Sequence, residues 1–142
     1  SLAYDPFHGA IEDVISERLG AGQETWLVSV HSFTPVYKGV QRPWHVGIIH
    51  DEDTRIAAPL IAALEADRNA VVGVNEPYSP ADRVYHTLAI HGRSRDLSCA
   101  MIEIRNDEIA DDAAQSLWAR RLATILSDIQ ESDASLGKKR PT

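Results

Sequence analysis

The sequence of 142 residues is poor in cysteine and in positive charge. Its single cysteine, Cys99, excludes an internal disulfide and gives no sign of an oxidising compartment. The chain has 14 Lys and Arg residues against 21 Asp and Glu residues, so its formal net charge is −7 at pH 7. Because nucleic-acid-binding surfaces need clustered basic residues to displace counterions, we expect no nucleic-acid partner.

The sequence also lacks the long apolar stretches that a membrane requires. No segment approaches the ~20 consecutive apolar residues of a membrane span, and no charged-then-apolar leader opens the chain. We therefore expect no membrane association and a cytoplasmic location. The one basic run, at positions 138–140, lies in a polar end of the chain that we interpret as a solvated tail.

Several motifs of common catalytic sites are absent as well. The sequence has no G-x-S-x-G motif of serine hydrolases, and no P-loop or G-x-G-x-x-G motif for phosphates or dinucleotides. It also has no H-E-x-x-H motif and no pair of C-x-x-C motifs. Cys99 lies inside an apolar segment, so we expect a buried structural thiol and not a nucleophile.

The apolar pattern that is present predicts helices alternating with strands. We expect helices at residues 5–20, 54–67 and 111–130, and strands at residues 26–30, 44–49, 70–74 and 99–104. Such alternation is typical of an α/β fold with a mixed, mostly parallel sheet flanked by helices. The length suits one domain, which we place at residues 1–131, followed by a polar tail at residues 132–142.

Polar residues lie at or just beyond the carboxyl end of each predicted strand. They are His31, His50, Asn75 and Glu103. In sheets of parallel strands, binding sites form beyond the carboxyl ends of the strands. We therefore expect these side chains to gather at one edge of the sheet.

His31 ends a run of apolar and β-branched residues, WLVSV, that is typical of a strand buried on both faces. A neutral imidazole held rigidly at the end of such a strand suits zinc, and it also suits a catalytic base. A core histidine with a satisfied hydrogen bond is the alternative. The residue pattern leaves these interpretations open.

Glu103 lies in a second apolar segment, SCAMIEIRND. The two-residue period of a strand places Glu103 and Arg105 on one face, opposite the neighbouring isoleucines. Burial of a carboxylate there is unfavourable unless it is paired or bound, and it raises the pKa towards the range of a general base. The alternative is a structural ion pair of Glu103 with Arg105 or with a histidine.

Two loops carry further candidate residues. In the motif NEPYSP, Asn75 and Tyr78 either hydrogen-bond a substrate or shape the turn. His91, Arg93 and Arg95 place positive charge in a loop of an otherwise acidic protein. This would allow Arg93 and Arg95 to bind the carboxylate of an anionic substrate, and surface ion pairs are the alternative.

Five segments then occur in a specific order: VSVHSFTPVYKG, RPWHVGIIH, VVGVNEPYSP, YHTLAIHG and AMIEIRND. Together they resemble the N-formylglutamate amidohydrolase family, particularly its branch of predicted bacterial members. The resemblance implies a fold similar to that of the zinc carboxypeptidases and related phosphorylase- and hydrolase-like proteins. It also implies zinc-dependent hydrolysis of N-formyl-L-glutamate to formate and glutamate, the last step of one histidine degradation route.

The resemblance implies roles for individual residues. His31, from the motif HSF, becomes a zinc ligand, and Glu103, from the motif EIR, becomes the general base. Asn75, Tyr78 and His91 line the site. The substrate is then a small anionic N-acyl amino acid, and a metal-dependent hydrolase of another acyl or peptide amide is the alternative.

The chain departs from the family in one respect. Family members are longer, and their upstream part carries a histidine of an HAG-type motif with further metal and substrate-binding residues. This chain resembles the C-terminal part only, and it contains no such motif. A zinc site needs about three protein ligands, so with His31 alone we expect an incomplete site. The chain would then be inactive by itself, either needing a missing N-terminal segment or being a non-catalytic fragment.

Overall fold

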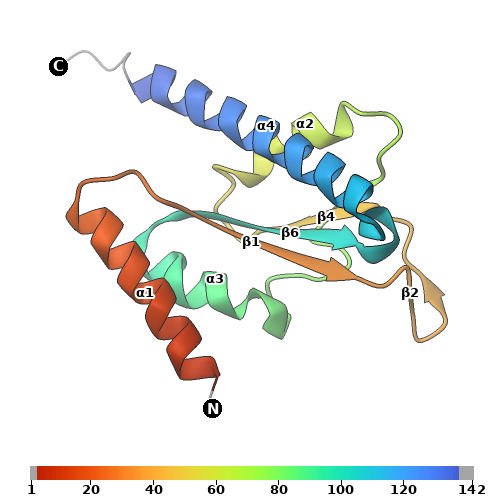
Figure 1. The fold of residues 1–142 in the computed structure, drawn as a ribbon, viewed down its shortest axis with the longest axis horizontal. Coiled ribbons are helices and arrows are strands. Elements are labelled where there is room, and N and C mark those ends of the chain that lie inside the picture. Colours follow the sequence, from red (N-terminus) through yellow and green to blue (C-terminus); the bar gives the residue numbers. More distant parts are fainter. Residues whose placement is uncertain (1–2, 138–142) are drawn as a thin grey trace.

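The computed structural model describes residues 3–137, and it describes side chains as far as residue 134. The elements follow one another along the chain as labelled in Figure 1. They are α1 (Tyr4–Gly20), β1 (Trp26–Phe33), β2 (Val36–Tyr37), β3 (Val40–Gln41), β4 (Val46–Ile49), α2 (Ala57–Glu65), β5 (Val72–Val74), η1 (Arg83–Tyr85), α3 (His86–His91), η2 (Arg93–Arg95), β6 (Ser98–Arg105), η3 (Asn106–Ile109) and α4 (Asp112–Gly137). None of the described helices has both the length and the apolar character of a membrane span.

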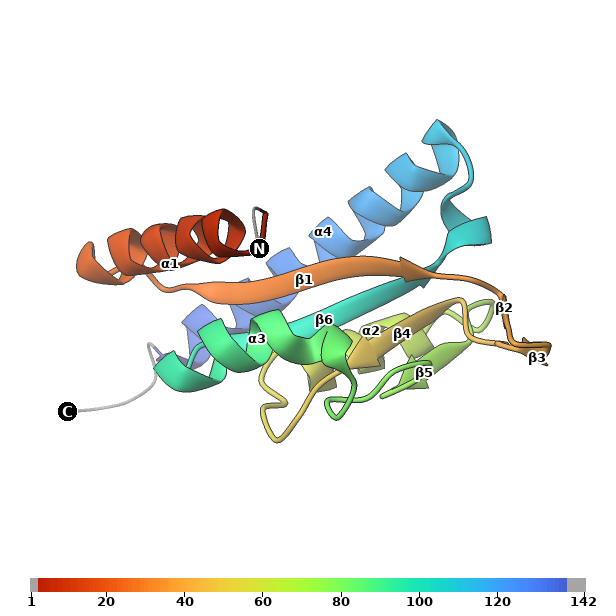
Figure 2. The same ribbon diagram turned by 90° about the horizontal axis from the view of Figure 1, so that it is seen from below.

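A four-stranded mixed sheet with the order β1-β6-β4-β5 forms the middle layer. The pairs β1–β6 and β4–β5 are parallel, whereas β4 and β6 are antiparallel. Helices α1 and α3 lie on one side of the sheet, and α2 and α4 lie on the other (Figures 1 and 2). The predicted α/β fold with a mixed, mostly parallel sheet between helices is therefore confirmed.

Each face of the sheet has its own apolar core, because alternate residues of β6 point to opposite faces. On the α2–α4 side, the main buried residues are Val46, Ile48, Ile56, Leu60, Leu64, Ile102, Ile104, Trp118 and Leu122. On the α3 side, they are Ile49, Tyr85, Leu88, Cys99 and Met101. Cys99 is a free, buried thiol, as the sequence predicts.

The predicted gathering of all four strand ends at one edge is wrong. Strand β4 runs antiparallel to β6. The carboxyl ends of β4 and β5 therefore lie on the opposite side of the sheet, along the strand direction, from the carboxyl ends of β1 and β6. The cause is the connection after β1, where the small antiparallel pair β2–β3 takes the place of a crossover helix. Parallel strands need a long crossover, whereas this connection turns the chain around and sends β4 back along the sheet.

The predicted burial of the first strand on both faces is also wrong. Strand β1 is at the edge of the sheet, and its residues change from half-buried to exposed towards its carboxyl end. Val30, for example, is 60% exposed. A run of β-branched residues does not distinguish a central strand from an edge strand.

The predicted helices and strands are all present, with shifted ends. The hairpin β2–β3 was not predicted from the sequence; its turn is made by Lys38 and Gly39, which both have positive φ. Helix α4 continues to Gly137, so residues 132–137 of the predicted polar tail are helical. The remaining residues of that tail, 138–142, lie outside the described residues.

One transverse row of residues crosses the sheet near the carboxyl ends of β1 and β6. His31 of β1 pairs in register with Glu103 of β6, which pairs with Gly47 of β4, which pairs with Gly73 of β5. Residues directly opposite each other on neighbouring strands share a face. Both glycines are needed because the loop after β5 folds back over them, with the Glu76 carbonyl oxygen against the sheet.

We expect Gly47→Ala to destabilise the fold. A Cβ at position 47 would lie 1.9 Å from the Glu76 carbonyl oxygen, so the loop at residues 75–78 would have to move off the sheet. The free energy of unfolding should fall by about 2–3 kcal/mol, as for other overpacked sites. Urea denaturation measures it. The matched control is Gly9→Ala in α1, where a Cβ meets nothing within 4 Å; it should stabilise the chain by about 0.5–1 kcal/mol.

Candidate active site

The row across the sheet brings two predicted residues together. His31 and Glu103 pair in register on the parallel strands β1 and β6, so their side chains lie on the same face of adjacent strands. The neighbouring strands β1 and β6 thus present an imidazole and a carboxyl group side by side, while the metal-binding and catalytic roles of these two residues stay predictions. His31 is exposed, and its imidazole has no hydrogen-bond partner among residues 3–137.

Glu103 is buried without a partner. It is 1% exposed, and its Oε2 atom has no hydrogen-bond partner within the described part of the chain. Burial raises the pKa of Glu103 to about 7, against the opposing influence of the Arg42 guanidinium. The alternative ion pair with Arg105 does not form, because Arg105 binds Asp107 with a nitrogen–oxygen distance of 2.7 Å.

Arg42 is a site residue that sequence reasoning missed. It lies just before β4 and is 9% exposed. Its guanidinium carbon lies 5.7 Å from the ring centre of Phe33, 4.7 Å from that of Tyr37 and 5.2 Å from that of Tyr78. The only signal in the sequence was its place in RPWHVGIIH, directly ahead of a buried strand.

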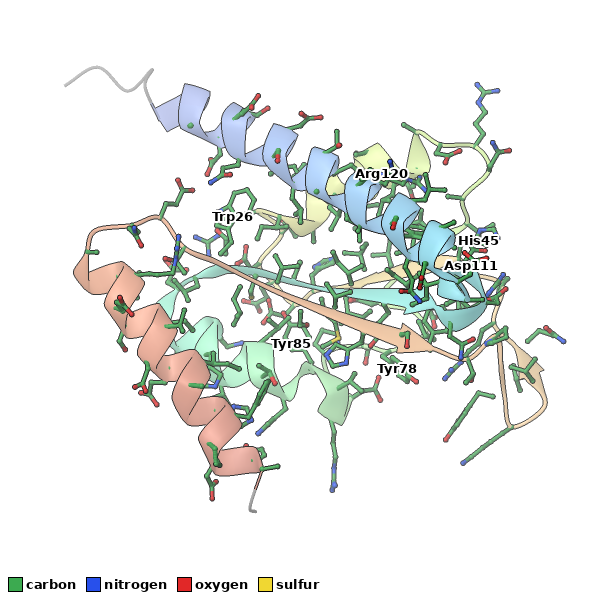
Figure 3. All side chains as sticks on the ribbon, viewed as in Figure 1. Trp26, His45, Tyr78, Tyr85, Asp111 and Arg120 are labelled. Atoms are coloured by element: carbon green, nitrogen blue, oxygen red, sulfur yellow. The ribbon has the colours of Figure 1, made fainter. Side chains whose placement is uncertain are left out.

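Tyr78 joins the same place from the loop after β5. That loop leaves the opposite edge of the sheet, turns back over Gly47 and Gly73, and brings the Tyr78 hydroxyl within 3.5 Å of Arg42 Nη2. Figure 3 shows Tyr78 beside the carboxyl end of β1. We call His31, Glu103, Arg42 and Tyr78 the Glu103 site.

Asn75 lies at the other edge of the sheet, where it shapes the turn. It has a positive φ of 55°, and its Oδ1 accepts a hydrogen bond of 2.9 Å from the backbone N–H of His50. Its own backbone N–H donates to the Ile48 carbonyl at 2.9 Å. These bonds hold the beginning of the loop to the end of β4, which is the turn-shaping alternative of the sequence interpretation.

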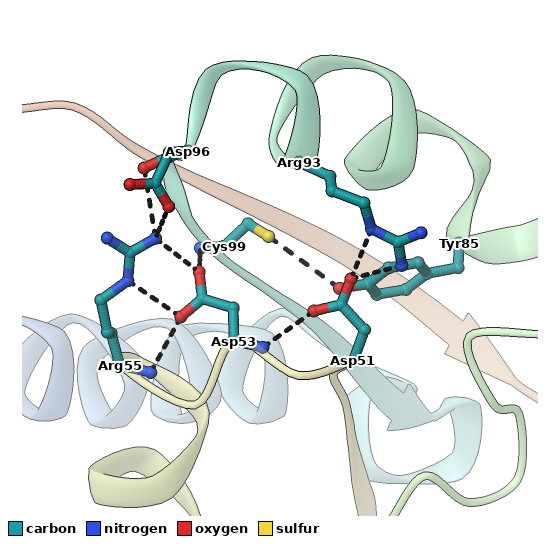
Figure 4. Close-up of polar contacts among 7 residues, drawn as sticks. All are labelled: Asp51, Asp53, Arg55, Tyr85, Arg93, Asp96 and Cys99. Carbon is teal, nitrogen blue, oxygen red and sulfur yellow. Dashed lines mark hydrogen bonds and ion pairs between the residues drawn. The ribbon is translucent and has the colours of Figure 1, made fainter.

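Arg93 lies near the same edge, in the polar network of Figure 4. Its Nη2 contacts Asp51 Oδ2 at 2.5 Å, while Arg55 bridges Asp53 and Asp96 at 2.9 and 3.2 Å. The network borders an open hollow of about 860 Å³. Because this hollow lies at the carboxyl end of β4, it is separate from the Glu103 site.

His91 and Arg95 belong to a third place, between α1 and α3. His91 Nε2 lies 2.7 Å from His8 Nδ1, and Arg95 binds Glu12 at 3.0 Å. Burial, together with His8, lowers the pKa of His91. The next residue along, Gly92, packs against Cys99, which precedes Glu103 by four residues or about 13 Å of strand.

The structure therefore brings together three predicted residues: His31, Glu103 and Tyr78. It places the four others elsewhere: Asn75, His91, Arg93 and Arg95. Roles for these four in one common site stay predictions.

The described residues do not by themselves make a zinc site. Structural and catalytic zinc ions take about three or four protein ligands. Among residues 3–137, no group of three His, Cys, Asp or Glu side chains is placed to hold a metal ion. His31 has an exposed imidazole, and its role as a zinc ligand stays a prediction.

We expect the buried Glu103 carboxyl group to make stability depend on pH. Its pKa rises from 4.5 to about 7 on folding, so the folded chain favours the protonated form. The associated stability is present below pH 4.5 and is lost as the pH rises through 7. At about 1.4 kcal/mol per pKa unit, this loss amounts to up to about 3 kcal/mol by pH 8.

The measurement is urea denaturation of the wild type and of Glu103→Gln at several pH values. The wild type should lose stability relative to the variant between pH 4.5 and 8. Parallel pH profiles for the two proteins would show that Glu103 ionises normally in the folded state.

Comparisons with known proteins bear on the family and on the fold. A family model described as N-formylglutamate amidohydrolase matches residues 1–110. The crystal structure of gene product Atu2144 from Agrobacterium tumefaciens superposes with a TM-score of 0.87 and 40% sequence identity over 92% of this chain. The match covers 52% of that protein, so this chain spans about half its length. No curated protein matches significantly. The chain belongs to the N-formylglutamate amidohydrolase family.

Proposed function

We propose that this protein is a zinc-dependent amidohydrolase that cleaves N-formyl-L-glutamate, or a similar N-acyl amino acid, with Glu103 as its general base. Family membership supports hydrolysis of an amide. The observation that carries the proposal is the buried, unpaired Glu103 carboxyl group beside the free imidazole of His31. As the family suggests, we place the reaction in histidine degradation in the cytoplasm.

The ionisation of Glu103 suits proton transfer in both directions. A carboxyl group with a pKa of about 7 is partly ionised at neutral pH, so it can accept a proton from the attacking water. Once protonated, its buried position stabilises the neutral acid. Glu103 then donates that proton to the nitrogen of the leaving amine. The residue thus acts first as base and then as acid.

His31 is proposed as one zinc ligand. It stands on the strand next to Glu103, so an ion bound to it would lie close to the base. The other ligands would come from outside the described residues, since these hold no group of three ligating side chains. When bound, zinc lowers the pKa of a coordinated water to about 7.

We expect Glu103→Gln in the full-length protein to lower kcat by at least about 100-fold, because an amide cannot take a proton from water. Zinc content should be unchanged. The assay uses N-formyl-L-glutamate and a panel of other N-acyl amino acids, so it also identifies the preferred substrate. The matched control is Arg120→Gln on the exposed face of α4. Activity retained by Glu103→Gln would remove Glu103 from this role.

We expect His31→Ala to lower the zinc content of the full-length protein. The loss of one of about three ligands weakens metal binding strongly. Metal analysis after dialysis measures the stoichiometry. The control is His50→Ala, whose imidazole follows β4 at the opposite edge of the sheet. If the stoichiometry does not change in His31→Ala, His31 is not a ligand, and a non-catalytic chain becomes the better interpretation.

A further inference from the structure

The Glu103 site contains a buried cation, Arg42, that forms no ion pair with a carboxylate of the described residues, although its charge acts on Glu103. Arg42 is 9% exposed. Its polar contacts are three long hydrogen bonds: Nη1 donates to the Thr34 carbonyl at 3.4 Å and to Thr34 Oγ1 at 3.5 Å, and Nη2 donates to the Tyr78 hydroxyl at 3.5 Å. Ordinary N–H···O bonds measure about 2.7–3.2 Å. Most of the donor capacity of this guanidinium is therefore unused.

Other half-buried arginines of this chain do not show this arrangement. Arg95 pairs with Glu12 at 3.0 Å, Arg105 with Asp107 at 2.7 Å and Arg121 with Asp67 at 3.1 Å. A buried charge is unfavourable unless it is paired. Arg42 is more buried than these arginines, and yet no carboxylate of the described residues forms an ion pair with it. A partner that the structure does not contain is the simplest way to satisfy it.

The rings around Arg42 favour a planar anion. Phe33, Tyr37 and Tyr78 hold the guanidinium through cation–π contacts. The rings supply no charged acceptor, and the printed hydrogen bonds of the guanidinium are long, so its N–H donors remain available to an anion. A guanidinium can bind a carboxylate in a bidentate geometry. The rings also restrict the arginine, so little conformational entropy is lost when an anion binds.

We propose that Arg42 binds a carboxylate of the substrate and thereby positions its amide bond at Glu103. This inference rests on the proposed function, and it names the residue that selects an anionic substrate. Arg93 and Arg95, which the sequence offered for this role, both already bind carboxylates of the chain. Arg42 acts on the same face of the sheet as Glu103, because Phe33 and Tyr78 flank it there.

The test compares wild type, Arg42→Gln and Arg42→Lys in the full-length protein, with Arg120→Gln as the control. The substrates are N-formyl-L-glutamate, which has both carboxylates, N-formyl-L-glutamine, which lacks the γ carboxylate, and N-formyl-L-isoglutamine, which lacks the α carboxylate. For wild type we expect kcat/KM to fall at least 100-fold when one particular carboxylate becomes an amide. Arg42→Gln should abolish this preference, mainly through KM. Arg42→Lys should retain part of the preference for the substrate that carries both carboxylates.

Other outcomes overturn the proposal. If Arg42→Gln lowers kcat/KM equally for all three substrates, Arg42 supports the loops or the reacting oxygen and binds no carboxylate. Loss of the preference in Arg93→Gln or Arg95→Gln, with Arg42→Gln unaffected, would assign the role to those residues. Thermal denaturation shows whether Arg42→Gln is folded. If it is unfolded, Arg42→Lys and Tyr78→Phe are used to test the proposal, because Tyr78→Phe removes only the hydroxyl group of Tyr78.

The proposed function can fail separately. If the wild type hydrolyses none of these amides, isothermal titration with L-glutamate and L-glutamine tests Arg42 alone. If the wild type binds glutamate and Arg42→Gln does not, Arg42 is an anion-binding residue even though the proposed reaction is wrong. Equal binding of glutamate by wild type and variant, or no binding by either, overturns the inference.

Discussion

The register between β1 and β6 is the constraint on which the site depends. It sets His31 beside Glu103 and continues through Gly47 to Gly73, so that one row spans the sheet. Because the row carries glycines at β4 and β5, the loop after β5 can fold onto the sheet there. Glu103 thereby stays out of water on a crowded face, and its carboxyl group favours the protonated form. A slip of one residue would turn Glu103 into the opposite apolar core.

The reversal of the chain after β1 separates the candidate residues into groups. It places the ends of β4 and β5 away from Glu103, with Asn75 and the ion pair of Arg93 and Asp51. The loop after β5 partly undoes this separation, since it returns across the sheet and brings Tyr78 to Arg42. The site is thus assembled from the carboxyl ends of β1 and β6 together with a loop that starts at the carboxyl end of β5.

The exposed half of β1 is consistent with the length comparison. The chain spans about half of the solved protein that it matches, and His31 stands on an edge strand with no partner among the described residues. A metal ligand needs to be accessible to the metal, whereas a general base gains from burial. His31 and Glu103 differ in this way although they are neighbours. The proposed division of roles follows from that difference in exposure.

By itself, the sequence determined the α/β alternation, the two faces of β6, the burial of Glu103 and Cys99, and the family. These depend on local periodicity and on the order of motifs, which are legible along the chain. Only the tertiary structure decided the direction of β4, the edge position of β1 and the unpaired state of Arg42. Strand direction and charge pairing depend on contacts between residues far apart in the sequence, and a motif such as RPWHVGIIH contains no record of which carboxylates fold next to its arginine.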